Sequence, residues 1–260
     1  MDTFDSGPPV AFAHHFNALP DYTPIKDNFW YDWGPVFYRG RLDGSAKVIC
    51  VASDPGPSER IACRTLVGNA GQRVQGFLNK IGITSSYVCV NGFAYALFPG
   101  SLGKGIKALS LPDQVVWRNK LFDMLKTQAV QAVIAFGTVA QTAVELWPQA
   151  SGLKVENTYH PSYHTTTPGS EKKMLTDWNR VVNELRAVVI PDPGAKTDLP
   201  LYGDKFAEED YAPIAKTDLP FGLADWFGDV KWFREHKGMN SVSRPSPDDR
   251  HTLVWKAPKF

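Results

Sequence analysis

The chain has 260 residues, of which 43% are hydrophobic and 21% are charged, and its formal net charge is +1. This composition is ordinary for a soluble globular protein, and no stretch approaches the ~18 consecutive apolar residues of a membrane span. A charge so close to neutral excludes a broad basic surface, so any contact with nucleic acid must use a local patch.

The cysteines indicate neither a disulfide scaffold nor a metal centre. Cys50, Cys63 and Cys89 are odd in number and form no Cys-x-x-Cys pair, which argues against a four-thiolate metal or iron–sulfur site. The N-terminus carries Asp2 and Asp5 and no basic stretch, so a signal peptide is not expected. We expect a cytoplasmic protein that needs no metal and no cofactor.

The N-terminal arm, residues 1–46, holds five prolines that rule out a long helix. Within the arm, residues 29–33 read Phe-Trp-Tyr-Asp-Trp. This aromatic stretch either anchors the arm on the body or provides a surface for base stacking. We expect an irregular arm that packs on the core.

The body, residues 47–190, alternates short apolar runs with segments of helical periodicity. Strands are expected over about 47–52, 87–90, 129–136 and 153–158, and helices over about 70–81, 112–128, 138–147 and 171–189. Four repeats of this alternation predict parallel βαβ units with right-handed crossovers. We therefore expect a three-layer α/β/α domain with a four-stranded parallel sheet, and a long loop over residues 93–111.

The C-terminal tail, residues 191–260, differs from the body in being rich in proline. The hexapeptide Ala-Lys-Thr-Asp-Leu-Pro occurs in it twice, at 195–200 and 215–220, which is too few copies for a solenoid. We expect an ordered extension that wraps the core, with a separate interaction element as the alternative. The sequence assigns no role to the repeated hexapeptide.

Three polar side chains follow predicted strands at the points where those strands end. They are Asp54, Asn91 and His160. In a parallel sheet the carboxyl ends of the strands lie along one edge, where open α/β folds place their ligands. Each residue alone also suits a plain turn or strand end, so the convergence is what predicts a shared site.

These residues resemble motifs of a known family. The segment 53–56 (Ser-Asp-Pro-Gly), Asn91 and the segment 160–162 (His-Pro-Ser) are similar to the motifs of the uracil-DNA glycosylase superfamily. Residues 66–72 (Leu-Val-Gly-Asn-Ala-Gly-Gln) resemble the segment that opens the first helix in its iron–sulfur-type family. The resemblance covers roughly residues 46–189 and implies a glycosylase-like fold, but the four cluster cysteines are missing.

The resemblance implies a catalytic pair. Asp54 would orient a water molecule and stabilise the oxocarbenium-like sugar, and His160 would donate a hydrogen bond to the departing base. Asn91 would read the Watson–Crick edge of the base. The implied base pocket consists of Ser53, Gly56, Leu66, Asn91 and Phe98.

Leu66 departs from the family pattern, since it stands where an aromatic side chain is expected against the flipped base. Either Phe93 or Phe98 replaces that ring, or the pocket is looser and accepts bases besides uracil. The sequence leaves these alternatives open.

The resemblance also implies a surface that binds DNA once the base has left the stack. Its residues would be Pro57, Ser58, Ser162, Tyr163, His164 and Thr165. The arginines at 60, 64 and 73 are candidates for a local positive patch beside it. We expect damaged DNA as the partner, no membrane, and a monomer.

The expected function is base excision repair of DNA. The enzyme would be a monofunctional DNA glycosylase that hydrolyses the N-glycosidic bond of uracil, or of hypoxanthine or xanthine, and leaves an abasic site. Neither motif holds a lysine, so a Schiff-base lyase route lacks support. Its expected location is the cytoplasm, at a bacterial-type nucleoid.

Two other functions stay open at this point. One is a damage- or abasic-site-binding protein of the same fold with little turnover. The other is a small-molecule nucleoside hydrolase. The range of bases and the preference for single- or double-stranded DNA are not determined by the sequence.

Overall fold

A computed structural model describes residues 4–163, 167–224, 227–229, 242–243 and 254–255. Its centre is a sheet with the strand order β1-β3-β2-β4-β5. The strands are β1 (Tyr38–Gly40), β2 (Val48–Ala52), β3 (Tyr87–Asn91), β4 (Ala132–Phe136) and β5 (Lys154–Thr158). The last four are parallel, as expected, and β1 pairs with β3 in the antiparallel direction.

The sheet thus has five strands, and the expectation of four was wrong. The additional strand, β1, comes from the N-terminal arm. Its three residues are too few to show a period, and its middle residue is Arg39, which a sequence pattern assigns to the surface. The structure buries Arg39 completely instead.

The helices are α1 (Val10–Asn17), α2 (Pro57–Ala62), α3 (Asn69–Lys80), α4 (Leu102–Leu109), α5 (Pro112–Leu125), α6 (Gly137–Glu145) and α7 (Ser170–Arg186). Helix α1 fits into the arm because its prolines flank it. Helix α4 lies where a loop was expected, because two glycines in its eight residues lower its intrinsic helix propensity. Among the described helices, none is both long and apolar enough to cross a membrane.

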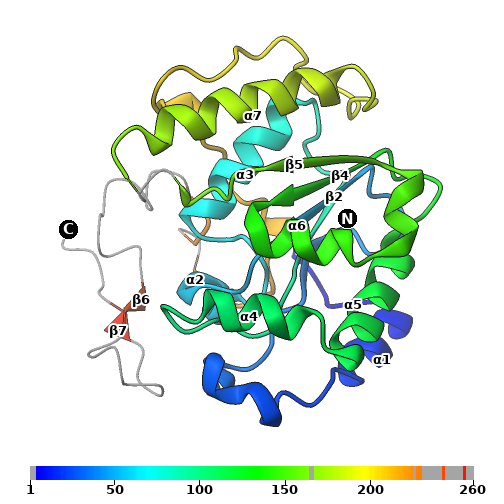
Figure 1. Ribbon diagram of the computed structural model, residues 1–260. Coiled ribbons are helices and arrows are strands. Elements are labelled where there is room, and N and C mark those ends of the chain that lie inside the picture. Colours follow the sequence, from blue (N-terminus) through cyan, green and yellow to red (C-terminus); the bar gives the residue numbers. More distant parts are fainter. Residues whose placement is uncertain (1–3, 164–166, 225–226, 230–241, 244–253, 256–260) are drawn as a thin grey trace.

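The apolar core lies on both faces of the sheet. On β2, Ile49 and Val51 pack into a cluster with α5 and α6, whereas Val48, Cys50 and Ala52 pack into a cluster with α3 and α7. Figure 1 shows these helices on opposite sides of the strands. The arrangement is α/β and compatible with three layers.

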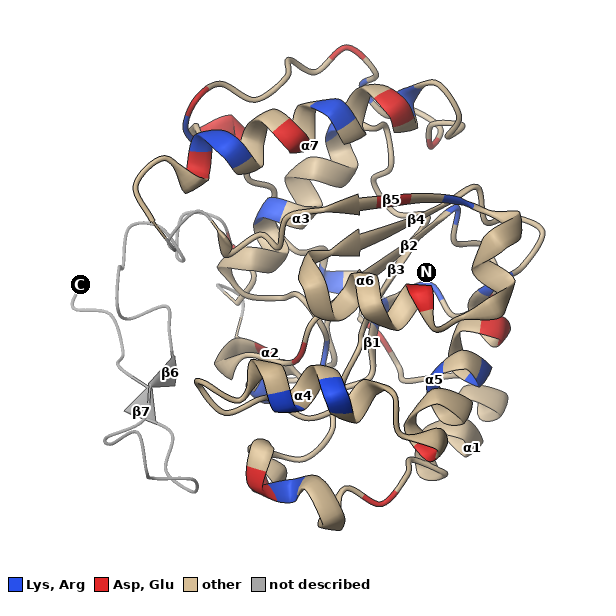
Figure 2. Cartoon of the chain, in the orientation of Figure 1, with Lys and Arg blue, Asp and Glu red and all other residues tan. Residues whose placement is uncertain are grey.

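The helices differ in the charge that they carry. Acidic and basic side chains alternate along α7, whereas the charged residues of α4 are both lysines (Figure 2). Alternating charge is typical of a solvated helix face. Helix α4 therefore adds a local positive charge to a chain whose net charge is only +1.

The described part of the tail lies against the body. Asp192 accepts hydrogen bonds from the backbone N–H groups of Thr84, Ser85 and Ser86 at 2.9, 2.9 and 3.0 Å. Farther along, Asp210 forms a buried ion pair with Lys80 of α3 at 2.8 Å. The arm and the tail both complete the packing of the body, so the division at residues 46 and 190 stays a prediction.

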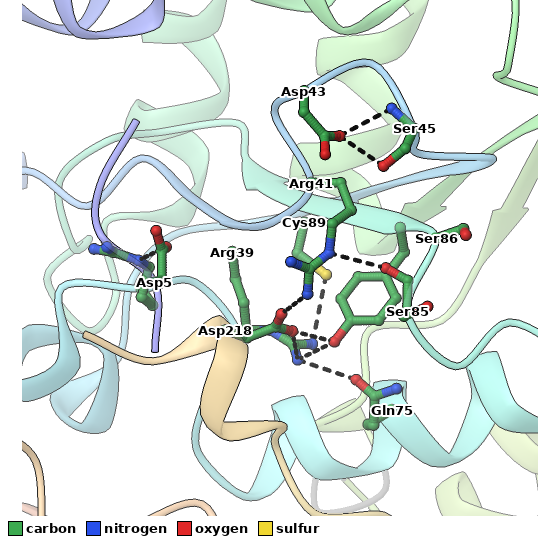
Figure 3. Close-up of polar contacts among 12 residues, drawn as sticks. Asp5, Arg39, Arg41, Asp43, Ser45, Gln75, Ser85, Ser86, Cys89 and Asp218 are labelled. Carbon is green, nitrogen blue, oxygen red and sulfur yellow. Dashed lines mark hydrogen bonds and ion pairs between the residues drawn. The ribbon is translucent and has the colours of Figure 1, made fainter. Parts of the chain in front are cut away.

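The second copy of the repeated hexapeptide places Asp218 in a buried cluster of polar groups (Figure 3). Its carboxylate pairs with Arg39 at 3.4 Å, and it also contacts Arg41 and the hydroxyl of Tyr87. The Arg39 guanidinium donates to Gln75 and Tyr87 as well, both at 3.0 Å. A fully buried guanidinium needs such a counter-charge. Asp218 of the tail therefore neutralises Arg39 in the strand that the arm contributes.

The two hexapeptide copies supply a matched pair of variants. Asp218→Ala leaves Arg39 buried without its carboxylate, and we expect the free energy of unfolding to fall by about 3–5 kcal/mol. Asp198, the same position in the first copy, is exposed, so Asp198→Ala should change it by less than about 0.5 kcal/mol. Urea denaturation of both variants checks this, and equal effects would contradict the role of Asp218.

Candidate active site

The carboxyl ends of the four parallel strands lie together at one edge of the sheet. Ala52 of β2 pairs with Asn91 of β3, and Phe136 of β4 pairs with Thr158 of β5. A cavity of about 440 Å³ opens at this edge. Its lining residues are Ser53, Asp54, Leu102, Phe136, Gly137, Thr138, Val139, Gln141, Thr158, Tyr159, His160 and Tyr163. The structure therefore brings Asp54 and His160 to one cavity.

Two hydrogen bonds fix the Asp54 carboxylate. The hydroxyl of Ser53 donates to Oδ1 at 2.6 Å, and the backbone N–H of Leu97 donates to Oδ2 at 2.8 Å. Loss of solvent raises the pKa of this carboxyl to about 6, against the effect of both hydrogen bonds, and the nearby Glu59 raises the pKa further. Asp54 is therefore ionised at neutral pH but still able to take up a proton.

The imidazole of His160 has a defined tautomer. The backbone N–H of Ser162 donates to Nδ1 of His160 at 3.2 Å, so Nδ1 is an acceptor. Desolvation lowers the pKa of His160 to about 4, which keeps the ring neutral at pH 7. A neutral ring whose Nδ1 accepts carries its proton on Nε2. His160 is thus a hydrogen-bond donor through Nε2.

Gly137 makes room for His160, and sequence reasoning assigned it no part in the site. It follows β4 with a φ of +83°, and a Cβ atom built on it would lie 2.9 Å from Cβ of His160. Such a distance is too short for a real contact. The signal available in the sequence was a glycine at a strand end, where a backbone of positive φ or a close approach is common.

Asn91 lies at the end of β3, on the other side of β2 from the β4 and β5 ends. Only 7% of it is exposed, and its Nδ2 group has no hydrogen-bond partner among the described residues. A buried amide left without a partner costs about 1–3 kcal/mol. It is not among the lining residues of the cavity, so a ligand would have to reach past Asp54 to satisfy it.

Leu66 does not line the cavity, and its expected contact with a base is not supported by its position. It has a φ of +52°, is 6% exposed, and packs into the core cluster beneath α3. A Cβ atom on Gly71 would lie 1.6 Å from the carbonyl oxygen of Leu66, so the turn at Leu66 packs directly against the backbone of α3. The motif at 66–72 thus has a packing role here.

Phe98 is also outside the cavity lining. Its ring packs on Trp30 at 4.3 Å between centroids, in a cluster that includes Trp33. This contact makes the aromatic stretch of the arm an anchor for the loop before α4. Aromatic rings in the lining come from Phe136, Tyr159 and Tyr163 instead, and no motif in the sequence marked Tyr159, which directly precedes His160, as a site residue.

The turn at Gly56, Pro57 and Ser58 caps helix α2. The carboxylate of Glu59 accepts hydrogen bonds from the N–H groups of Gly56 at 3.0 Å, Val67 at 2.8 Å and Gly68 at 3.0 Å. This leaves the Gly56 N–H engaged, and Ser58 is buried at 9% exposure. The expectation that this turn grips a phosphate has no support in its hydrogen bonds. A Glu three residues after the cap was the available signal.

The segment after His160 contributes only part of the predicted DNA surface. Ser162 is exposed, and the ring of Tyr163 stacks on Tyr159 at 4.4 Å while lining the cavity. His164 and Thr165 lie outside the described residues. Tyr163 thus lies beside the cavity, and its contact with DNA stays a prediction.

Two of the three arginines expected in a positive patch, Arg64 and Arg73, are buried and engaged within the protein. Arg64 is paired with Asp5 at 2.6 Å, and it is 8% exposed. Arg73 is 6% exposed, and its guanidinium donates to the carbonyl of Pro161 at 3.2 Å. Both side chains hold loops in place. Arg73 in particular fixes the turn that follows His160.

No metal ligation is evident in the part of the chain that the structure describes. Its His, Cys, Asp and Glu side chains form no group of three or more that could hold a metal ion. The polar side chains at the strand ends of this edge are a carboxylate, an imidazole and an amide.

Adding a methyl group at position 137 tests whether Gly137 provides the space that His160 needs. Gly137→Ala places a side chain at positive φ and against His160, and we expect it to lower the free energy of unfolding by about 2–4 kcal/mol. Gly194→Ala has a similar φ of +77° with nothing within 4 Å, so it should lose only about 1–2 kcal/mol. Urea denaturation measures both, and equal losses would show that Gly137 provides no space for His160.

Comparisons with known proteins add no family to this geometry. No protein-family model matches the chain, and no curated protein matches it. The function of this edge is therefore inferred from Asp54, His160 and Asn91 themselves.

Proposed function

We propose that this protein is a monofunctional DNA glycosylase that hydrolyses the N-glycosidic bond of uracil, or of another deaminated base, and leaves an abasic site. The observation that carries the proposal is the pairing of Asp54 and His160 in one cavity of about 440 Å³. One group is an anion poised to accept a proton, and the other is a neutral hydrogen-bond donor. Those are the two groups that cleavage of this bond needs.

Asp54 is the group that acts at the sugar. As the bond between C1′ and the base breaks, positive charge develops on the sugar ring, and an anion beside it lowers the barrier. The same carboxylate accepts a proton from the water that attacks C1′. Its two hydrogen bonds hold it in place, and a pKa of about 6 makes it a competent base near neutral pH.

His160 is the group that acts at the leaving base. The pair of electrons from the broken bond leaves with the base, which departs as an anion with its charge on a carbonyl oxygen. A neutral imidazole stabilises this oxygen by donating a hydrogen bond to it through Nε2. The Ser162 N–H bond to Nδ1 is what supports this tautomer.

Asn91 is proposed to recognise the base. Its buried Nδ2 group has no partner among the described residues, and a carbonyl oxygen of a flipped base would satisfy it. Neither Leu66 nor Phe98 lines the cavity, so we propose that a ring of Phe136, Tyr159 or Tyr163 stacks on the base. Hypoxanthine and xanthine stay among the proposed substrates beside uracil.

This proposal includes the finer fold assignment and the cellular setting. The parallel order of β3, β2, β4 and β5, with functional residues after β2, β3 and β5, supports a fold of the uracil-DNA glycosylase type. The proposed setting is base excision repair of cytoplasmic, nucleoid-type DNA by a monomer.

Substitution of the catalytic pair tests the proposal. With a uracil-containing oligonucleotide and abasic sites scored by alkaline cleavage, Asp54→Asn and His160→Ala should each lower the single-turnover rate by about 10²–10⁴. DNA binding should change little, and Asp113→Asn, an exposed acidic residue on α5, is the matched control. Absence of cleavage of uracil, hypoxanthine and xanthine by the wild type would overturn the proposal, and tight binding without turnover would favour a damage-binding protein.

The pH profile tests the role of Asp54. Because the reaction needs the ionised carboxylate, kcat/KM should rise about tenfold per pH unit below pH 6 and level off above it. His160, with a pKa of about 4, stays neutral over this range and should add no second pH dependence to kcat/KM. The rise of kcat/KM toward pH 6 should be lost in Asp54→Asn. A wild-type profile that is flat between pH 5 and 8 would contradict the assignment.

A further inference from the structure

Glu59 is a buried acidic side chain, five residues after Asp54, that the proposed reaction does not use. Only 8% of it is exposed. Among the ion pairs of the described residues, none includes Glu59. A buried carboxylate without a cation is costly unless hydrogen bonds satisfy its oxygens. The surroundings of Glu59 therefore have to account for its burial.

Three backbone N–H groups hold the Glu59 carboxylate between the starts of two helices. Oε2 accepts from Gly56, the residue before α2, at 3.0 Å. Oε1 accepts from Val67 at 2.8 Å and from Gly68, the residue before α3, at 3.0 Å. The N-terminus of α3 stabilises a negative charge at this place. Both oxygens of Glu59 are thus engaged by the backbone.

The same hydrogen bonds fix the turn that carries Asp54. Gly56 is two residues after Asp54, and Pro55 between them has a fixed φ angle. A Cβ atom on Gly56 would lie 2.8 Å from Oε2 of Glu59, so the turn packs closely on this carboxylate. Because the other oxygen of Glu59 binds the start of α3, the side chain ties the Asp54 turn to that helix.

Glu59 is also the charged group that acts on Asp54. Asp54 shares its cavity with His160, which burial keeps neutral at pH 7, and with Tyr159 and Tyr163. The loop before α4 contributes a backbone N–H group. Burial raises the pKa of Asp54 most, and the negative charge of Glu59 raises this pKa further. A carboxylate beside a like charge binds a proton more tightly, which makes it a stronger base.

The alternative is that Glu59 only caps α2. A glutamate three residues after the N-cap closes a capping box, and a glutamine also serves there. Capping of α2 uses the oxygen that is bonded to Gly56. The second oxygen, at the start of α3, and the negative charge near Asp54 are not needed for that cap.

We propose that Glu59 is a positioning residue for the proposed reaction, which fixes the turn that holds Asp54 and whose negative charge makes Asp54 a stronger base toward the attacking water. This inference rests on the proposed function, because it concerns the same carboxylate. Glu59 is not among the residues that line the cavity, so it acts through Asp54.

Two substitutions separate the charge of Glu59 from its reach. In Glu59→Gln the plateau of kcat/KM should fall about tenfold to hundredfold, because one of the three N–H groups loses its acceptor and the turn shifts. The midpoint of the pH profile should also move below pH 6, because the like charge is gone. Glu59→Asp keeps the charge on a shorter side chain, so its plateau should fall while its midpoint stays closer to that of the wild type.

Glu145→Gln is the matched control, since it removes the same charge from an exposed position on α6. It should change neither the plateau nor the midpoint. Urea denaturation of each variant establishes that the protein measured is folded. A purely structural role of Glu59 would lower the plateau and the stability and leave the midpoint where it is.

A readout without turnover separates this inference from the proposed function. The titration of the Asp54 carboxyl can be followed by carbon-13 NMR, with its signal assigned by Asp54→Asn. The midpoint should be lower in Glu59→Gln than in the wild type, even if the wild type cleaves no base. Equal midpoints, or a higher one in Glu59→Gln, would overturn the effect of the charge, and a wild-type plateau in Glu59→Asp would overturn the positioning.

Discussion

The common direction of β3, β2, β4 and β5 is the constraint on which the candidate site depends. Their register aligns Ala52 with Asn91 and Phe136 with Thr158, so the next residues of each strand leave the sheet at one edge. That edge places a carboxylate after β2 and an imidazole after β5, with β4 between them. Gly137, which directly follows β4, leaves space for His160 beside that strand end.

Burial sets the protonation of the pair, because it raises the pKa of Asp54 and lowers that of His160, and backbone groups of two loops hold the two side chains in place. The Leu97 N–H holds Asp54, and the Ser162 N–H selects the tautomer of His160. Each loop is held in turn by groups distant in sequence. The arm fixes the first, since Trp30 donates to the carbonyl of Ala96 at 2.7 Å, and Arg73 of α3 fixes the second. The tail adds stability by neutralising Arg39. The arm, the tail and α3 therefore all help to hold the candidate site in place.

Hydrophobic periodicity and the positions of glycine and proline were enough to predict the parallel strands, four of the helices and the side chains at the strand ends. These signals do not predict features that depend on contacts between residues far apart in the sequence. Strand β1 is short and carries a buried Arg39, which only the distant Asp218 makes tolerable. The family resemblance implied substrate contacts for Leu66 and Gly56, but Leu66 packs into the core and the Gly56 N–H donates to the Glu59 carboxylate. The role of Gly137 depends on a contact with a residue 23 positions away, which no local pattern encodes.

The most direct test of the central claim is a crystal structure of the protein with duplex DNA that contains 2′-fluoro-2′-deoxyuridine, whose N-glycosidic bond resists cleavage. The account predicts a uracil flipped into the cavity, with the Asp54 carboxylate facing C1′ and Nε2 of His160 within hydrogen-bond distance of a base carbonyl. A base bound at another surface, or a flipped base with neither Asp54 nor His160 beside the glycosidic bond, would contradict it.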